Sequence, residues 1–479
     1  MSKRISTWRG SRGLLALIAL ALVGCAAIST RSYKDLKYPP LGEVQIPSIE
    51  RVELDNGMIL YLVEDHEFPT IDLRARIRTG SMYDPADKIG LAGITGQVMR
   101  TGGTTSIPGD ELDEILEGMA ASVETWIGAT EGGASMSLMK GDLDKGLDIL
   151  ADVLMHPAFP EDKIKLAKIQ AKSQISRRND DPWSITSREF NKLIYGPDHP
   201  YARHTEYATI DAIAREDMTA FHRKYFHPNN VIMAVWGDFD TEEMKEKISR
   251  AFADWKPEET AFPPVPEIVR DRPPSVNYIY KEDVNQTNIF IGHLGVRADD
   301  PNYHALILLQ EILGGGFTSR LFKEVRSNLG LAYAVWATSG VGFHHPGVFY
   351  AGCSTKSAST HAALDAMMAQ LKRITEEEVT NEELELAKER IRNSYVFKFD
   401  TKGEIVERKV FYEFYGYPTD FLEKYREGIE KVTQADILEA AKARIHPDRF
   451  TILAVGRAQD FDRPLDDLGP VNTIDMFNS

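Results

Sequence analysis

An internal repeat of about 220 residues is the feature that most constrains the fold. Residues 161–175, EDKIKLAKIQAKSQI, match residues 381–395, NEELELAKERIRNSY, with Leu-Ala-Lys aligned at an offset of 220. Residues 225–238 match residues 444–457 at an offset of 219, and both segments carry His-Pro, an apolar run and a glycine. Several landmarks at nearly one spacing predict two homologous domains that arose by duplication.

A proline-rich stretch separates the two halves. Residues 257–274, PEETAFPPVPEIVRDRPP, hold six prolines, which exclude a helix or a central strand. We therefore expect an N-terminal domain over residues 51–256, a linker over 257–274, a C-terminal domain over 275–460 and a tail over 461–479.

Each half mixes strand and helix patterns. Asn56-Gly57 between two apolar runs is typical of a hairpin turn. Residues 71–77 alternate apolar and polar side chains, as a strand with one buried face does. Leucines spaced by three and four residues over 143–154 indicate a helix. The predicted class is α+β, with a mostly antiparallel sheet and packed helices in each domain.

The N-terminus has the layout of a secretory signal. A basic segment precedes an apolar run that is too short to span a bilayer. The run ends in Leu-Val-Gly-Cys at residues 22–25, which resembles a bacterial lipobox. The sequence predicts a lipoprotein signal over 1–24, a lipid-bearing Cys25 and a tether over 25–50. A plain signal with an incidental cysteine is the alternative. We expect a lipid-anchored protein on the periplasmic side of the envelope, at the outer membrane.

Composition narrows the possible partners. The formal net charge of −16 argues against nucleic acid, because binding to phosphates needs a basic surface. The second cysteine, Cys353, stands between apolar neighbours and is predicted to be a small buried residue rather than a nucleophile.

Residues 90–104, GLAGITGQVMRTGGT, have the pattern of a helix with one core face. Positions 93 and 97 are four apart, so their side chains lie one above the other. In an H-x-x-E-H helix these two positions hold zinc-binding histidines and position 96 holds the glutamate that takes a proton from zinc-bound water. Here the three positions carry Gly93, Gly96 and Gln97.

The frame around this helix resembles the pitrilysin/insulinase-type zinc peptidases, in particular their bacterial, processing-peptidase-like branch. RTGSMYDP before the helix, DDPW, YGPDHPYARH and FHPNNVIMAVWGDFD carry the resemblance over nearly the whole mature chain. The resemblance implies two homologous domains that form a half-clamshell. It also implies a last zinc ligand 77 residues past the second histidine position, which is Gln174.

All four family positions are therefore substituted. Glycine offers no side chain and neutral glutamine is a poor zinc ligand. We expect no cofactor in this chain, zinc in a partner subunit, and no activity of the chain alone. The other candidate ligands are histidines without a metal-binding spacing, and we expect them to be surface or capping residues: His66, His199, His204, His344 and His345.

Arg326 and Tyr333 stand seven residues apart across a turn at Gly330. The resemblance implies that these two residues reach the zinc site of another half or subunit. There the tyrosine would donate a hydrogen bond to the developing oxyanion, and the arginine would hold a substrate carbonyl or fix the tyrosine. The alternative is a surface arginine paired with a nearby glutamate, such as Glu324, and a tyrosine packed in a strand.

Two further segments are candidates for substrate binding. Gly314, Gly315 and Gly316 lack the Lys-Ser/Thr of a phosphate loop, and we interpret them as a flexible loop at the mouth of the chamber. Residues 120–130 stand where the family has an edge strand that pairs with extended substrate, with Ser122, Val123 and Glu124 as the candidate contacts. An ordinary sheet strand is the alternative. The candidate substrate-binding residues are thus Gly314, Gly315, Gly316, Ser122, Val123 and Glu124.

The sequence thus predicts the non-catalytic subunit of a periplasmic zinc metallopeptidase. A zinc-bearing sister subunit with H-x-x-E-H would be its partner and a peptide its substrate. The alternative hypothesis is an envelope scaffold or peptide-binding protein without a catalytic role.

Overall fold

The computed structural model describes residues 46–399 and 401–476. The chain divides into two compact units, residues 1–43 and residues 44–479, and the second is described here. The predicted signal, the lipid-bearing Cys25 and most of the tether lie outside the described residues. The predictions for them stay predictions.

Six strands form the sheet of the N-terminal half: β1 (Glu50–Glu53), β2 (Ile59–Glu64), β3 (Thr70–Ile77), β4 (Ser122–Ile127), β5 (Gly132–Met139) and β6 (Val231–Gly237). Their order across the sheet is β1-β2-β6-β3-β5-β4, so β4 lies at one edge. Only β2 and β6 pair in parallel among these strands. The alternation predicted for residues 71–77 is confirmed, because every second side chain of β3 is buried.

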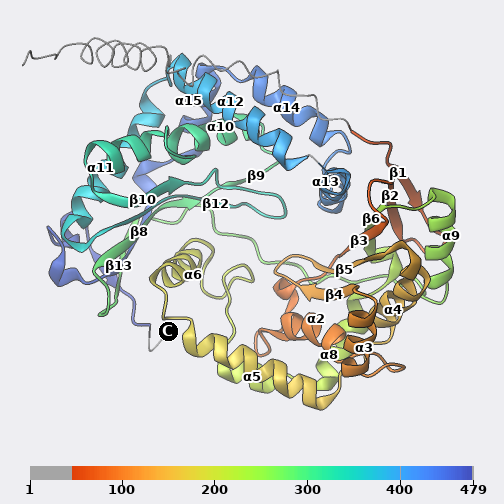
Figure 1. The fold of residues 1–479 in the computed structure, drawn as a ribbon. Coiled ribbons are helices and arrows are strands. Elements are labelled where there is room, and N and C mark those ends of the chain that lie inside the picture. The colour runs from red at the N-terminus through yellow and green to blue at the C-terminus, as the bar shows by residue number, and fades with distance from the viewer. Residues whose placement is uncertain (1–45, 400, 477–479) are drawn as a thin grey trace, which may run out of the picture. The chain divides into compact units, whose positions relative to one another are not determined.

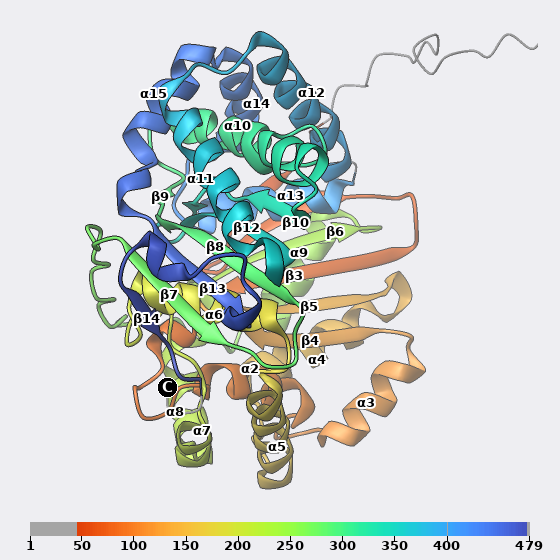
Figure 2. The same cartoon turned by 90° about the vertical axis from the view of Figure 1, so that its left-hand side faces the viewer.

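A second sheet belongs to the C-terminal half: β7 (Ser275–Tyr280), β8 (Gln286–Leu294), β10 (Ala332–Ala337), β12 (Val348–Lys356), β13 (Thr451–Gly456) and β14 (Val471–Thr473). Its order is β10-β12-β8-β13-β7-β14, which places β10 at an edge. Figure 2 shows β14, β7, β13 and β8 as neighbours. A separate two-stranded ribbon pairs β9 (Val296–Arg297) with β11 (Val341–Gly342). Part of the predicted tail therefore adds a strand to this sheet.

The two sheets repeat one topology. The order β2-β6-β3-β5-β4 corresponds to β7-β13-β8-β12-β10. The parallel pair recurs in both, as β2 with β6 and β7 with β13. Only the outer strand differs, since β1 precedes its sheet in the chain and β14 follows its sheet. The predicted α+β class and the two homologous domains are confirmed.

Helices pack on both sheets. In the N-terminal half they are α2 (Leu91–Thr101), α3 (Gly109–Gly118), α4 (Leu143–Met155), α5 (Glu161–Arg177), α6 (Pro182–Tyr195), α7 (Tyr207–Ala212), α8 (Arg215–Tyr225) and α9 (Thr241–Ala251). In the C-terminal half they are α10 (Tyr303–Gly314), a π-helix (Phe322–Asn328), α11 (Thr360–Glu376), α12 (Asn381–Lys398), α13 (Lys402–Phe414), α14 (Phe421–Lys431) and α15 (Gln434–Arg444). None of the helices in the described part of the chain is long and apolar enough to cross a bilayer.

The two halves exchange one helix each. Helix α6 follows α5 in the N-terminal half but packs on β8 and β13, where Phe190 lies against Phe290 and Tyr350. Helix α13 of the C-terminal half packs in turn on β2 and β6, where Val406 and Val410 join a buried cluster of the first sheet. Figure 1 shows α6 beside β8 and β13, and α13 beside β3 and β6. Each sheet is therefore completed by a helix of the other half.

Cys353 lies fully buried in β12, as the sequence predicts. Burial raises the pKa of its thiol to about 12, so the thiol stays protonated at neutral pH.

We predict that Phe190→Ala destabilises both halves together. Phe190 is 1% exposed, and removal of a buried phenyl ring costs about 3–5 kcal/mol of unfolding free energy. The measurement is urea unfolding followed by tryptophan fluorescence and circular dichroism. Phe68→Ala is the matched control, because Phe68 is 64% exposed and its loss changes stability by less than about 0.5 kcal/mol. Unchanged stability of the Phe190 variant contradicts the exchange of helices.

Candidate functional site

Helix α2 occupies the place of the predicted metal-binding helix. Its N-terminus is held by the carboxylate of Asp84, which accepts hydrogen bonds from the backbone N–H groups of Gly90 at 2.8 Å and Ala92 at 2.9 Å. Burial raises the pKa of Asp84 to about 6, although the two N–H groups act in the opposite direction. Asp84 belongs to the RTGSMYDP segment, and the sequence analysis did not identify it as an anchor of the helix.

The middle of α2 lies against the edge strand β4. A side chain at Gly96 would bring its Cβ to 2.7 Å from the carbonyl carbon of Trp126, a contact that real Cβ atoms do not make. Thr125 of β4 donates a hydrogen bond from Oγ1 to the carbonyl of Gly96 at 2.6 Å. Arg100 donates from Nε to the carbonyl of Val123 at 2.6 Å. The backbone of β4 thus occupies the space in which the family's glutamate would begin.

The other two positions of the motif are exposed. An added Cβ at Gly93 would meet nothing within 4 Å. Gln97 donates from its amide Nε2 to Oε1 of Gln170 on α5, at 2.6 Å. Gln174, the predicted last ligand position, is exposed on the same helix, one turn further along. Gln170 was missed by the sequence analysis, because a spacing of 77 residues points to Gln174 alone.

These residues do not fit a zinc ion. Two of the four positions have no side chain, the amide of Gln97 is engaged with Gln170, and the position of the base is filled by backbone. Within the described residues, no group of three or more His, Cys, Asp or Glu side chains is placed to hold a metal ion. The donor set therefore supports no metal chemistry at α2.

Four of the five other candidate histidines have structural partners, whereas the buried Nε2 of His204 has no hydrogen-bond partner among the described residues. Tyr201 stacks on His345 at a centroid distance of 3.7 Å and hydrogen-bonds to Nδ1 of His344 through its hydroxyl at 3.3 Å. His199 hydrogen-bonds through Nε2 to the carbonyl of Pro266 at 3.0 Å. This aromatic cluster joins the HPYARH loop to the segment between β11 and β12. His66 is exposed and pairs with Asp238 at 2.7 Å.

Arg326 and Tyr333 lie together on the surface. The guanidinium carbon of Arg326 is 5.5 Å from the ring centroid of Tyr333 and 4.7 Å from that of Phe322. Tyr333 is 75% exposed, so it is not packed within its strand. Glu324 accepts a hydrogen bond from Asn328 instead of pairing with Arg326. The two structural alternatives for this pair are therefore not what the structure shows.

The backbone under both residues is irregular. Arg326 lies in the π-helix Phe322–Asn328. Such helices are rare in proteins, and those that occur are often found at functional sites. Tyr333 is the extra residue of a β-bulge in the edge strand β10, because Ala332 pairs with Thr355 and Ala334 with Ser354. A bulge re-aims one side chain of a strand. Neither residue makes a hydrogen bond or ion pair with residues 91–101 in the part of the chain described.

The three glycines end helix α10. Gly314 is buried against the backbone of Ala337, so no side chain fits there. Arg390 of α12 donates a hydrogen bond to the carbonyl of Gly315, and Gly316 has a positive φ of 144°. Packing explains Gly314, and the backbone conformation explains Gly316. Their contact with substrate stays a prediction.

Residues 120–130 contain the edge strand predicted for peptide binding. Strand β4 pairs on one side only, with β5. Ser122 and Glu124 are exposed, whereas the side chain of Val123 is fully buried and its carbonyl is engaged by Arg100. The edge position is as predicted, and the open groups on this strand are those of Ser122 and Glu124.

The fold and the site together define a duplicated α+β peptidase frame whose metal-binding positions hold no metal ligand. Two family profiles match the chain: "Insulinase (Peptidase family M16)" over residues 61–197 and "Peptidase M16 inactive domain" over residues 212–391. The chain belongs to this insulinase family, peptidase family M16.

Some relatives in this family are named as zinc proteases and others as non-peptidase homologs. The chain is 25% identical over 416 residues to an uncharacterized zinc protease of Rickettsia bellii, across 84% of this chain and 96% of the relative. It is 21% identical over 417 residues to the non-peptidase homolog YmxG of Helicobacter pylori, across 86% of this chain and 95% of the relative.

Solved structures show the same fold. A peptidase M16 inactive domain from Pseudomonas fluorescens superposes with a TM-score of 0.78 at 24% identity, over 87% of this chain and all of the other. A protease from Helicobacter pylori superposes with a TM-score of 0.77 at 19% identity, over 85% of this chain and 99% of the other.

We predict opposite effects of alanine at two positions of α2. Gly93→Ala raises the unfolding free energy by about 0.5–1 kcal/mol, because alanine favours the helix and meets no neighbour. Gly96→Ala lowers it by about 1–3 kcal/mol, because the new methyl group collides with β4. Denaturant unfolding of the two variants measures both changes. A stable Gly96→Ala protein would show that β4 does not lie on α2.

We also predict that the fold loses stability as the pH falls from about 6.5 to about 4. Burial lowers the pKa of four histidines to about 4: His204, His222, His293 and His345. The unfolded chain, with a histidine pKa of about 6.5, binds more protons in this window, so acidification favours unfolding. The raised pKa values of Asp84 and His66 act in the opposite direction, but these two groups are fewer than the four histidines.

The measurement is unfolding free energy at pH 7 and pH 5. His222→Gln should reduce the loss between the two values by about 1–2 kcal/mol. His66→Gln is the control, since the pKa of His66 is raised by Asp238 and its removal does not reduce the loss. If His222→Gln and the parent protein lose equal unfolding free energy between pH 7 and pH 5, the lowered pKa of His222 is not a source of the loss.

Proposed function

We propose that this chain is the non-catalytic subunit of a heteromeric zinc peptidase on the periplasmic side of the envelope. The observation that carries the proposal is the placement of Arg326 and Tyr333. The two side chains meet on an exposed surface, on a π-helix and a β-bulge, without a carboxylate partner among the described residues. A fold that has lost all four positions of its metal motif has kept this pair.

The two residues suit a developing oxyanion. The hydroxyl of Tyr333 is a hydrogen-bond donor on a side chain that projects from the sheet edge. Arg326 places its positive charge over the face of the Tyr333 ring, which orients the ring and favours negative charge near it. The sister subunit would supply the metal, the water and the base from its intact H-x-x-E-H helix.

Exposed apolar side chains lie on the same chain segment as the pair. Phe317 is 77% exposed and packs edge-on against Phe322 at a centroid distance of 4.9 Å, and Leu329 is 50% exposed. A cluster of this kind is common at surfaces that bind another protein or a peptide. It supports the view that the Arg326 and Tyr333 surface faces a partner subunit or its substrate.

Peptide substrate would reach this subunit at its sheet edges. Strands β4 and β10 are each paired on one side only, and an extended peptide adds to such an edge by backbone hydrogen bonds. The bulge at Tyr333 lies on β10 itself. Peptide and side-chain donor would thus meet along one strand.

The location of the complex rests on residues 1–25. A basic segment, a short apolar run and Cys25 in a lipobox-like sequence support export and a lipid anchor at the outer membrane.

A second candidate is a peptide-binding or scaffold protein of the envelope without a catalytic role. The open edge of β4, with Ser122 and Glu124 exposed, favours it, because backbone capture of a peptide needs neither Arg326 nor Tyr333. The two functions therefore differ in their dependence on these two residues.

The test uses the chain together with the H-x-x-E-H sister that co-purifies with it from the native envelope. Cleavage of a quenched fluorescent peptide by the mixture should fall about 100-fold with Tyr333→Phe and at least as far with Arg326→Ala, as expected for loss of an oxyanion donor. Size-exclusion chromatography checks that both variants still form the complex.

Two matched variants control for surface changes. Arg223→Ala and Tyr207→Phe alter exposed residues on α8 and α7 and should leave cleavage within twofold of the parent mixture. Full activity of Arg326→Ala and Tyr333→Phe removes the catalytic proposal. In that case, peptide binding measured by fluorescence anisotropy on the chain alone decides for the second candidate.

A further inference from the structure

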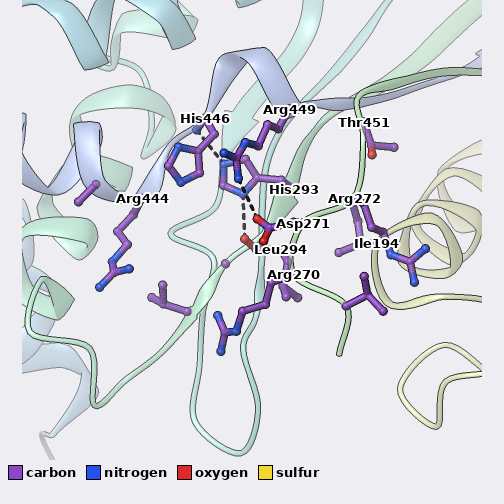
Figure 3. A pocket seen from close by; sticks show the side chains of 14 residues that line it. Ile194, Arg270, Asp271, Arg272, His293, Leu294, Arg444, His446, Arg449 and Thr451 are labelled. Atoms are coloured by element: carbon purple, nitrogen blue, oxygen red, sulfur yellow. Dashed lines mark hydrogen bonds and ion pairs between the residues drawn. The ribbon is translucent and has the colours of Figure 1, made fainter. Parts of the chain in front are cut away.

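A deep hollow opens where the proline-rich linker meets the C-terminal sheet. We name it the arginine pocket, after the side chains that dominate its wall: Arg270, Arg272, Arg444 and Arg449, with His293 and His446. Its empty volume is about 850 Å³, including the solvent at its open side. Figure 3 shows these residues, which come from the linker, from β8, from the end of α15 and from the turn that follows it.

Positive charge in this pocket exceeds negative charge. Arg449 pairs with Asp271 at 2.8 Å, and Arg444 pairs with Asp300 at 2.8 Å. Arg270 and Arg272 have no carboxylate within ion-pair distance in the part of the chain described. The pocket thus keeps two positive charges in a chain whose formal net charge is −16.

Donor groups in the pocket also exceed acceptors. The Nε atoms of Arg444 and Arg272 are buried and have no hydrogen-bond partner among residues 46–399 and 401–476. Arg272 uses its Nη2 to hold the carbonyl of Tyr195 at the end of α6, which fixes this side of the wall. Figure 3 shows Arg270 and Arg444 extending toward the same side of the view, away from the pair of Arg449 and Asp271.

The buried histidine of the pocket, His293, does not supply the missing acceptors. His293 donates from Nδ1 to the carbonyl of Leu294 at 2.8 Å and accepts at Nε2 from the backbone N–H of His446 at 3.1 Å. Both ring nitrogens of His293 are therefore engaged, and burial lowers its pKa to about 4, so it is neutral at pH 7. An anion in this pocket would be held by the arginines.

We propose that the arginine pocket binds a small molecule or headgroup that carries a phosphate monoester, with Arg270 and Arg444 as its principal contacts. Guanidinium groups form paired hydrogen bonds with phosphate oxygens. A phosphate monoester carries close to two negative charges at neutral pH, and it would meet the unpaired charge of Arg270 together with the open Nε donor of Arg444, whose own charge is paired with Asp300. Nucleic acid does not suit it, because a long polyanion needs an extended basic surface and this chain is acidic elsewhere.

The binding test uses isothermal titration calorimetry on the full-length protein with glycerol 3-phosphate as the probe. We expect one site per chain. Arg270→Gln and Arg444→Gln should each weaken the affinity at least tenfold. Arg223→Gln, which changes an exposed arginine on α8, is the matched control and should leave the affinity unchanged.

Arg270 is exposed and has no ion-pair partner among the described residues, so its variant keeps the fold, and an unchanged thermal unfolding midpoint verifies this. No heat of binding, or binding that both pocket variants retain, overturns the proposal. Succinate, a dicarboxylate of similar charge, should bind at least tenfold more weakly. Equal affinity for succinate overturns the assignment to phosphate.

A second arm separates a lipid headgroup from a soluble phosphate compound. Vesicles of phosphatidylcholine with phosphatidic acid are compared with vesicles of phosphatidylcholine alone, which control for any lipid anchor. Cosedimentation that needs phosphatidic acid and is lost in Arg270→Gln assigns the site to a headgroup. Binding of glycerol 3-phosphate without this cosedimentation assigns it to a soluble molecule.

Discussion

The contact between helix α2 and strand β4 at Gly96 is the constraint on which the rest of this site depends. The strand backbone comes so close to the helix that only glycine fits, and Thr125 and Arg100 fasten the two elements with hydrogen bonds of 2.6 Å each. The packing of α2 on β4 thus leaves no room for a glutamate side chain at position 96. A single substitution at this position would restore a carboxylate only by moving the edge strand. Gly93 and Gln97, by contrast, lie open to solvent. A larger side chain is therefore excluded by packing at Gly96, whereas positions 93 and 97 have room for one but carry no metal-binding group.

The exchange of helices explains why the frame persists without its metal. Helix α6 completes the core of the C-terminal sheet through Phe190, and α13 completes that of the N-terminal sheet through Val406 and Val410. Neither sheet is covered by its own half alone. The surface of Arg326 and Tyr333, the edge of β4 and the arginine pocket are therefore carried on one interlocked core, which does not need a metal ion to hold its parts in place.

Much of the fold was predictable from the sequence, because a duplication repeats its landmarks at a fixed spacing and alternation marks a half-buried strand such as β3. The substituted motif was predictable because the resemblance to the zinc peptidases assigns its positions to Gly93, Gly96, Gln97 and Gln174. The exchange of α6 and α13 was not, because a local pattern shows which face of a helix is apolar but not which sheet that face covers. Gln170 was missed because its partner Gln97 lies close only in the folded chain. Asp84 was missed because its partners are backbone N–H groups of Gly90 and Ala92, which leave no signal in the residue pattern.

The pairing of Arg326 with Tyr333 was expected from the family frame, but the physical reasons for it were not. A π-helix and a bulge have no reliable signature in a single sequence. The arginine pocket was equally hidden. Its residues stand far apart along the chain, in the linker, in β8 and at the end of α15, and only the packing of the linker brings their charges together.

The central claim is that this molecule keeps the frame of a zinc peptidase and the side chains for an oxyanion, but has no metal of its own. Elemental analysis of the purified full-length protein, after dialysis against zinc-containing buffer and then metal-free buffer, tests it most directly. The account predicts zinc far below one equivalent per chain, with no change on addition of a chelator. One tightly held zinc ion per chain, lost together with the fold or with a peptidase activity when a chelator is added, would contradict it.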